Sequence, residues 1–127
     1  MHDIIYNAIR TPDGTVLQSR SRHDFKTYTD ANGKEYMIDG GLSYVRCSAN
    51  GDEEHLTVTL EDAHAKVREV CDWGTYGING DQPLTYKLLC NMSTNHINAV
   101  LKNVPSINLA IKIAMENEIK YREWIIL

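Results

Sequence analysis

The stretch DWGTYGINGDQPLTYKLLCNMSTNH, residues 72–96, separates a β-rich first half of the chain from a helical second half. It contains two glycine-bearing turns and then a short apolar run, residues 84–89, which favours a strand. It closes near Ser93, a preferred N-cap residue whose hydroxyl accepts a hydrogen bond from the first helical turn. Aromatic rings, amide side chains and a helix N-terminus together suit a nucleotide base and a phosphate. The stretch is therefore either a ligand site or only the connection between the two halves.

The composition predicts a single soluble domain, residues 1–127. A chain of 127 residues with 43% hydrophobic and 24% charged residues can bury a core without crosslinks. Its three widely spaced cysteines argue against a disulfide framework and favour a reducing cytoplasm, and no apolar run is long enough to cross a membrane. A formal net charge of −4 argues against binding to a nucleic acid polymer, whereas a local basic cluster can still bind a small anion.

Two β-hairpins are predicted in the first half. Pro-Asp-Gly at residues 12–14 and Asn-Gly at residues 32–33 are strong turn signals, because Pro presets φ and Gly tolerates positive φ. The β-prone runs that flank these turns are residues 4–9 and 15–21, and residues 25–29 and 35–38.

After the second hairpin we expect a further strand at residues 42–47 and a polar surface loop at residues 48–55. A short alternating run follows at residues 56–60. The β-rich half thus spans residues 1–60, and residues 61–92 contain a helix, the glycine-rich turn and the last strand, residues 86–89.

Three helices are predicted. The spacing of apolar residues indicates an amphipathic helix over residues 62–71, with Thr59 and Asp62 forming a start that resembles a capping box. A second helix covers residues 93–103, and a third begins after Ser106 and covers residues 107–124. The predicted fold class is therefore α+β, with an N-terminal antiparallel sheet, one middle helix and a helical pair in residues 93–127.

The last helix carries a wide apolar stripe, and the chain then ends on Ile125, Ile126 and Leu127. Both features fit burial in a homo-oligomer, either a dimer or a higher assembly. Packing into the core of a monomer explains them equally well.

No catalytic constellation, metal site or cofactor is predicted. The five histidines and three cysteines lack the spacing of a zinc site, and the chain has neither a nucleophile elbow nor a glycine-rich phosphate loop. Arg22-His23-Asp24 is a compact charged triplet, more often a salt-bridged turn than part of a metal phosphohydrolase. Cys71 falls on the apolar face of its helix, which favours a buried and inert thiol.

Groups suited to recognition do gather in the second half of the chain. Each alone is more often core or solvated surface, but their clustering predicts binding without chemistry. They are aromatic residues for stacking (Trp73, Tyr76 and Tyr86), amides for base edges (Asn91, Asn95 and Asn98) and cations for phosphates (Lys112, Lys120 and Arg122).

Seven short blocks are distributed along the chain, namely Asn7-Ala8-Ile9, Pro12-Asp13-Gly14-Thr15, Arg22-His23-Asp24, Tyr36-Met37-Ile38-Asp39-Gly40-Gly41, Trp73-Gly74-Thr75-Tyr76-Gly77, Gln82-Pro83-Leu84 and Asn117-Glu118-Ile119-Lys120-Tyr121-Arg122. In this order, and over nearly the whole chain, they resemble a widespread group of small bacteriophage proteins. More narrowly, the chain resembles the first family of Thoeris anti-defence proteins. These are phage sponges that sequester the cyclic ADP-ribose signal made by a bacterial TIR-domain enzyme.

The resemblance implies an oligomer, from a dimer up to a hexamer, that acts in the host bacterial cytoplasm and holds its cyclic nucleotide intact. In some members it implies a second site for cyclic oligonucleotides of the CBASS type. An aromatic residue that stacks on the ligand matches Tyr86 or a neighbouring position, and an amide at the start of the next helix matches Asn95. Basic residues of the last helix that pair with the pyrophosphate match Lys112 and Arg122 least well, because acidic residues lie between them.

With Trp73, these four residues form the predicted ligand site, and the predicted function is sequestration of a cyclic nucleotide immune signal by a protein that is not an enzyme. Two alternatives stay open. One is a phage protein that inhibits a host enzyme by binding to it through the apolar C-terminal helix. The other is a small nucleotide-processing enzyme that uses Arg22-His23-Asp24.

Overall fold

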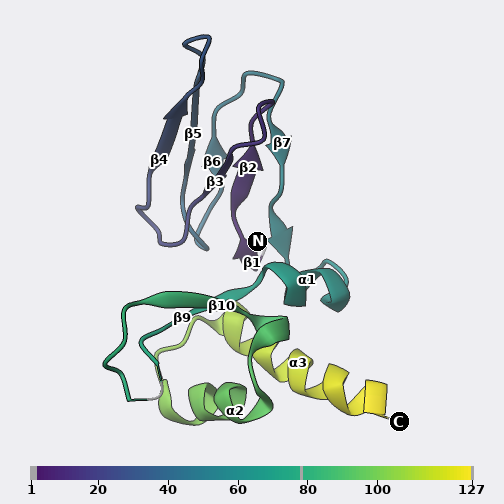
Figure 1. Ribbon diagram of the computed structural model, residues 1–127. Coiled ribbons are helices and arrows are strands. Elements are labelled where there is room, and N and C mark those ends of the chain that lie inside the picture. The colour runs from purple at the N-terminus through teal and green to yellow at the C-terminus, as the bar shows by residue number, and fades with distance from the viewer. Residues whose placement is uncertain (1–2, 78, 127) are drawn as a thin grey trace. The chain divides into compact units, whose positions relative to one another are not determined.

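The computed structural model describes the backbone of residues 3–77 and 79–126, and the side chains of residues 3–77 and 79–124. The α+β class is confirmed, with several antiparallel sheets and three α-helices in this part of the chain (Figure 1). The chain divides into two compact units, Met1–Glu61, called unit 1 below, and Asp62–Leu127, called unit 2. The side chains of residues 125–127, which the sequence marks as an apolar end, lie outside the described part.

Unit 1 consists of short antiparallel strands rather than the one N-terminal sheet that was predicted. Its described strands form two three-stranded sheets, in the orders β3-β2-β7 and β4-β5-β6, and a pair β1-β8. The strands are β1 (Ile4–Tyr6), β2 (Ala8–Arg10), β3 (Val16–Gln18), β4 (Lys26–Thr29), β5 (Glu35–Asp39), β6 (Arg46–Cys47), β7 (Glu54–His55) and β8 (Val58–Thr59).

Both predicted hairpins are confirmed. Strands β2 and β3 pair around the Pro-Asp-Gly turn, where the Gly14 N–H donates to the Thr11 carbonyl at 2.9 Å. Strands β4 and β5 pair around the Asn-Gly turn, where the Asp30 carboxylate accepts from the backbone N–H groups of Asn32 and Lys34, both at 2.9 Å. The two three-stranded sheets share one core, made by Ile9, Leu17, Tyr36 and Ile38, with Tyr28 and Cys47 packed against it.

Asn7 breaks the strand predicted over residues 4–9 into β1 and β2. Its buried side-chain amide donates to the carbonyls of Asp39, Gly41 and Tyr44 at 3.1, 2.9 and 3.1 Å. These carbonyls belong to the end of β5 and the turn after it, where Gly41 has φ +53° and a Cβ would lie 2.2 Å from the Ser21 backbone. This turn also shortens the strand predicted over residues 42–47 to β6, and the loop predicted over residues 48–55 ends in strand β7.

Unit 2 contains a helix, a β-hairpin and two further helices. The first glycine-bearing turn, predicted over residues 74–77, is partly wrong, because Gly74 and Thr75 belong to a strand that pairs with the following one. The elements are α1 (His64–Val70), β9 (Asp72–Thr75), β10 (Thr85–Leu88), the 3₁₀ turn η1 (Leu89–Asn91), α2 (Thr94–Asn103) and α3 (Leu109–Ile126).

Two of the predicted helix starts are wrong. Helix α1 begins after Ala63 without a side-chain cap, because the Thr59 hydroxyl accepts instead from the Glu61 N–H at 3.2 Å. Helix α3 begins two residues later than predicted, and Asn108, not Ser106, caps it by accepting from the Ile111 N–H at 3.1 Å. Asn and Ser are both good N-caps, so the turn geometry after Pro105 selects between them.

The core of unit 2 lies between α1, η1, α2 and α3. Cys71 is 1% exposed, as predicted, and burial raises the pKa of its thiol to about 12, so the neutral thiol packs as an apolar group. The other buried apolar residues are Val67, Leu89, Met92, Ile97, Val100, Ala110, Ile111, Ala114 and Met115. None of the helices in the described residues has the length and apolar character needed to cross a membrane.

Candidate functional site

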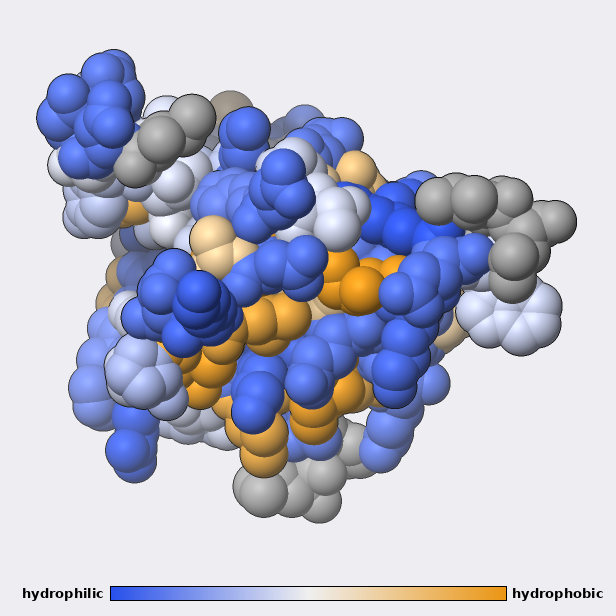
Figure 2. Space-filling view, turned by 90° about the horizontal axis from the view of Figure 1, so that it is seen from below, coloured by the Kyte–Doolittle hydropathy of each residue, from blue (hydrophilic) through white to orange (hydrophobic). Residues whose placement is uncertain are grey.

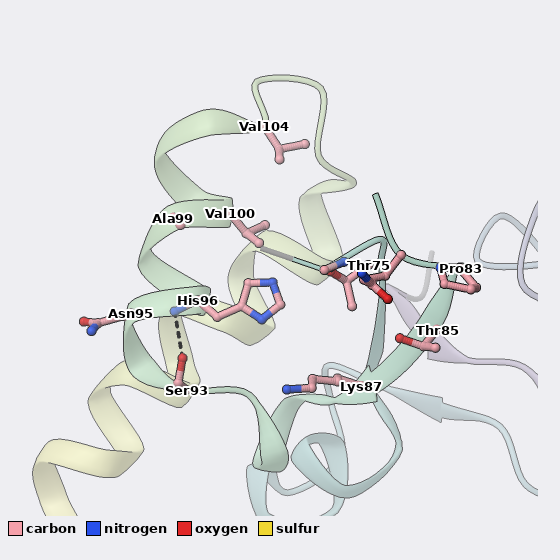
Figure 3. A pocket seen from close by; sticks show the side chains of 12 residues that line it. Thr75, Pro83, Thr85, Lys87, Ser93, Asn95, His96, Ala99, Val100 and Val104 are labelled. Carbon is pink, nitrogen blue, oxygen red and sulfur yellow. Dashed lines mark hydrogen bonds between the residues drawn. The ribbon is translucent and has the colours of Figure 1, made fainter. Parts of the chain in front are cut away.

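Unit 2 contains a cavity of about 750 Å³ between the β9–β10 hairpin and α2 (Figure 3). The side of unit 2 that carries α2 shows apolar side chains gathered between polar ones (Figure 2). The residues that line the cavity are Thr75, Gly77, Gln82, Pro83, Thr85 and Lys87 from the hairpin and its loop, and Ser93, Asn95, His96, Ala99, Val100 and Val104 from α2 and its ends.

The first turn of α2 forms the polar part of the helical wall. Ser93 is its N-cap, as predicted, and its hydroxyl accepts from the His96 N–H at 3.1 Å. Asn95 and His96 also line the cavity, and Figure 3 shows the His96 ring directed from α2 toward the hairpin. The partial positive charge of a helix N-terminus favours an anion at this end of the cavity.

Strand alternation decides which side chains of the hairpin line the cavity. In the antiparallel register Thr75 lies opposite Thr85, and Trp73 lies opposite Lys87. Directly opposed residues share a face of a sheet, so these four point to the same side. Figure 3 shows Lys87 extending from β10 toward α2, which brings an ammonium group to the polar wall.

The cavity combines one ammonium group, one imidazole, several neutral polar groups and an apolar patch. Hydroxyls come from Thr75, Thr85 and Ser93 and an amide from Gln82, whereas Pro83, Ala99, Val100 and Val104 are apolar. Figure 3 shows the Asn95 amide directed away from the hairpin, so this residue lines the cavity without turning its amide into it. None of the lining residues of the described structure is a carboxylate or a cysteine. Such a lining suits an organic anion with both apolar surface and hydrogen-bonding edges.

The five predicted site residues lie in three different environments. Asn95 lines the cavity, and half-buried Trp73 lies on the same sheet face without lining it. Tyr86 is 47% exposed and lies on the opposite face, over Gly74, where an added Cβ would be 3.2 Å from the ring. Lys112 is exposed on α3 and is not part of the lining, and Arg122 is bonded within the protein.

Sequence reasoning missed Lys87 and His96, the two lining side chains that can carry positive charge. The signal was present in both cases. Alternation from Thr85 places Lys87 on the same face, and the N-cap at Ser93 places His96 in the first helical turn.

Arg122 belongs to a buried ionic cluster around Glu118, a residue of α3 that is 0% exposed. Arg68 of α1 grips both carboxylate oxygens: Nε donates to Oε1 at 2.9 Å and Nη2 to Oε2 at 2.8 Å. His64 Nε2 lies 2.9 Å from Oε1, and Arg122 Nε donates to Oε2 at 2.7 Å. The Arg68 guanidinium also lies 4.7 Å from the centre of the Tyr121 ring.

The Glu118 carboxylate stays ionised despite its burial. Burial by itself raises the pKa of Glu118, but the hydrogen bonds from Arg68, His64 and Arg122 outweigh it and hold the pKa at about 2. A buried charge requires such compensation, because leaving it unpaired costs several kcal/mol. We therefore assign Arg122 to this cluster and not to a phosphate site, because its Nε bonds Glu118 and its Nη groups bond Thr94, Leu89 and Met92.

The triplet Arg22-His23-Asp24 forms a turn in unit 1. The Asp24 carboxylate accepts from the Arg20 N–H at 2.9 Å and pairs with Lys26 at 3.0 Å. The Arg20 bond holds the pKa of Asp24 below its usual range. In the described residues no group of three or more His, Cys, Asp or Glu side chains is arranged to hold a metal ion.

Comparisons of the chain with protein-family models, curated proteins and solved structures found no match. The candidate site therefore rests on its own geometry.

Proposed function

We propose that this protein binds a cyclic nucleotide immune signal, a cyclic ADP-ribose isomer, and sequesters it without degrading it. In this proposal the protein is a phage anti-defence sponge that acts in the host bacterial cytoplasm. The same role extends to cyclic oligonucleotides if a second site is present. The observation that carries the proposal is the cavity between β9–β10 and α2.

The size and lining of the cavity support a ligand of this class. Small-molecule sites enclose roughly 300–1,000 Å³, and this cavity measures about 750 Å³. Lys87 and the first turn of α2 would receive the pyrophosphate, while Gln82 would bond a base edge or ribose. The apolar patch that includes Val100 and Val104 would cover the base.

Rough energetics agree with tight binding. A hydrogen bond to a charged group contributes roughly 1.5–3 kcal/mol, and a stacked base contributes about 1–3 kcal/mol. Two interactions of each kind would give sub-micromolar affinity after the costs of association. A sponge also needs no proton transfer or nucleophile, so the proposal assigns no catalytic residue.

The proposal is tested with a thermal-shift panel of cyclic ADP-ribose isomers and cyclic oligonucleotides, with linear ADP-ribose as the control compound. A ligand at 100 times its Kd stabilises the folded state by about 2.7 kcal/mol, which is a shift of several degrees for a domain of this size. Heating the complex and chromatography of the released molecule then separate the outcomes. Recovery of intact ligand supports a sponge, conversion supports an enzyme, and no shift with any compound removes the proposal.

We also propose that the working form is a homo-oligomer. The apolar side chains that unit 2 leaves exposed support it: Leu84, Tyr86 and Leu88 are 46, 47 and 36% exposed on the hairpin. Light scattering of the purified protein tests it, and a monomer at micromolar concentration would contradict it.

A second candidate, inhibition of a host enzyme by direct binding, is supported by two residues of α3. Trp124 is 76% and Leu109 67% exposed, and exposed large apolar residues are typical of protein interfaces. A stable host partner in a pull-down, lost in Trp124→Ala and with no small molecule carried along, would favour this function over sequestration.

A further inference from the structure

Arg122 connects the buried ionic cluster to the wall of the cavity. Besides its bond to Glu118, its Nη1 donates to the Thr94 hydroxyl at 2.9 Å, and its Nη2 donates to the carbonyls of Leu89 at 3.1 Å and Met92 at 2.7 Å. One side chain of α3 thus holds both ends of the segment that leads from η1 into α2. Residues Ser93, Asn95 and His96, which line the cavity, come at the end of this segment.

We propose that Arg122 is a positioning residue for the cavity: anchored by Glu118, it fixes the first turn of α2 without touching the ligand. The anchor is rigid because Glu118 is also held by both guanidinium contacts of Arg68 and by His64. The planar guanidinium suits this task, since its donors are arranged in a fixed fork that reaches several acceptors at once.

The geometry separates the role of Arg122 from that of Arg68. Both pair with the same buried carboxylate, at 2.7 and 2.8 Å. Arg68, on α1, makes its other contact with the Tyr121 ring. Only Arg122 of this pair is bonded to η1 and α2 in the described structure. Replacing each arginine by lysine keeps a cation beside Glu118, so the two variants differ mainly in the link to the cavity wall.

A lysine at position 122 cannot reproduce this link. Its single ammonium group has three donors at one point and cannot span a carboxylate, a hydroxyl and two carbonyls. The loss of hydrogen bonds to Thr94, Leu89 and Met92 would let the first turn of α2 open more often. Ordering that turn again on binding would reduce ligand affinity, because the bound conformation is then no longer preformed.

The experiment compares Arg122→Lys with Arg68→Lys in the full chain, first without any ligand. Hydrogen exchange of single amides is measured by NMR. We expect exchange of the Met92 and His96 amides to be at least about tenfold faster in Arg122→Lys than in the wild type. The Val104 amide, at the far end of α2, should not change, and Arg68→Lys should leave the Met92 and His96 amides protected.

Affinity for the cyclic ADP-ribose isomers is the second readout and is the only part that rests on the proposed function. We expect Kd to rise about tenfold in Arg122→Lys and less than about threefold in Arg68→Lys. If the wild type binds none of these compounds, the proposed function fails, while the exchange comparison still decides the role of Arg122.

Three outcomes would overturn the positioning role. One is equal exchange of the Met92 and His96 amides in the two variants. Another is faster exchange throughout unit 2, including Val104, in Arg122→Lys. The third is weaker binding with unchanged exchange, which would mean direct contact with the ligand. If Arg122→Lys does not fold, Thr94→Val is used in its place. This substitution removes the hydrogen bond between Arg122 and the exposed Thr94 hydroxyl, and the His96 amide should then exchange about threefold faster.

Discussion

The fully buried Asn7 and Ser19 of unit 1 bond backbone groups, whereas the fully buried Glu118 of unit 2 bonds charged side chains. In unit 1 the Asn7 amide donates to three carbonyls, and the Ser19 hydroxyl accepts from the Gly41 N–H at 2.8 Å and donates to the Asp24 carbonyl at 2.7 Å. In unit 2 Glu118 instead gathers two arginines and a histidine from two helices.

The difference follows from the backbone groups that need hydrogen-bond partners in each unit. Short strands leave many turn carbonyls inside unit 1, and neutral amides and hydroxyls satisfy them without burying a charge. Unit 2 joins helices that have few backbone groups to share, so long charged side chains make the connection. This arrangement leaves the other side of α2 free to line a cavity.

The largest effect is expected when the cluster loses its anion. Glu118→Ala leaves the half-buried Arg68 and Arg122 without their carboxylate partner and should lower the free energy of unfolding by about 3–5 kcal/mol. Glu116→Ala, at an exposed position of the same helix, is the control and should change it by less than about 0.5 kcal/mol. Urea denaturation measures both, and similar losses in the two variants would refute the role of the cluster.

A smaller loss is expected from unit 1. Asn7→Ala leaves the carbonyls of Asp39, Gly41 and Tyr44 without their donor and should destabilise the protein by about 2–3 kcal/mol. Asn32→Ala, in an exposed hairpin turn, should cost less than about 1 kcal/mol. Denaturation followed by NMR signals of unit 1 tests this, and equal effects would show that the Asn7 amide is not the support of the turn.

Acid should weaken the cluster through Glu118. Its pKa is about 2 in the folded protein against an ordinary value of 4.5, so its contribution to stability is complete above pH 4.5 and is lost as the pH falls toward 2. Glu118→Gln lacks this titration but keeps the other carboxylates. The stability difference between wild type and variant should therefore be constant above about pH 5 and shrink below it. A difference independent of pH down to 2 would contradict the lowered pKa.

The smallest effect concerns the cavity, where Lys87 and Lys112 form a matched pair. Lys87 lines the cavity and Lys112 does not. Lys87→Ala should weaken binding of the cyclic ADP-ribose isomers about 10- to 100-fold through the loss of a charge-assisted bond, and Lys112→Ala less than about threefold. Calorimetric titration measures the Kd of both variants. A larger loss of affinity in Lys112→Ala than in Lys87→Ala would place the site on the surface of α3 instead.

Local physics made much of the fold predictable. The turns at residues 12–14 and 32–33 and the N-cap at Ser93 depend on partners within a few residues, and all three were predicted correctly. The burial of Cys71 followed from helical periodicity within one short segment. Ser106 and Asn108 are both suitable N-cap residues for the last helix, and the backbone geometry of the turn determines that Asn108 is the cap.

The site depended on longer-range information. The sequence predicted Asn95 and the start of α2 as recognition elements, and both lie at the cavity. The sequence did not predict which partner each basic residue bonds, because these partners are far apart along the chain. Arg68 and Glu118 are separated by 50 residues, and Arg122 and Leu89 by 33. Basic residues look alike in a sequence, whereas the pairing of one with a buried carboxylate and the direction of another toward a cavity are properties of packing. The sequence alone determined the turns, caps and apolar faces, and only the tertiary structure decided that Lys87 lines the cavity while Arg122 supports its wall.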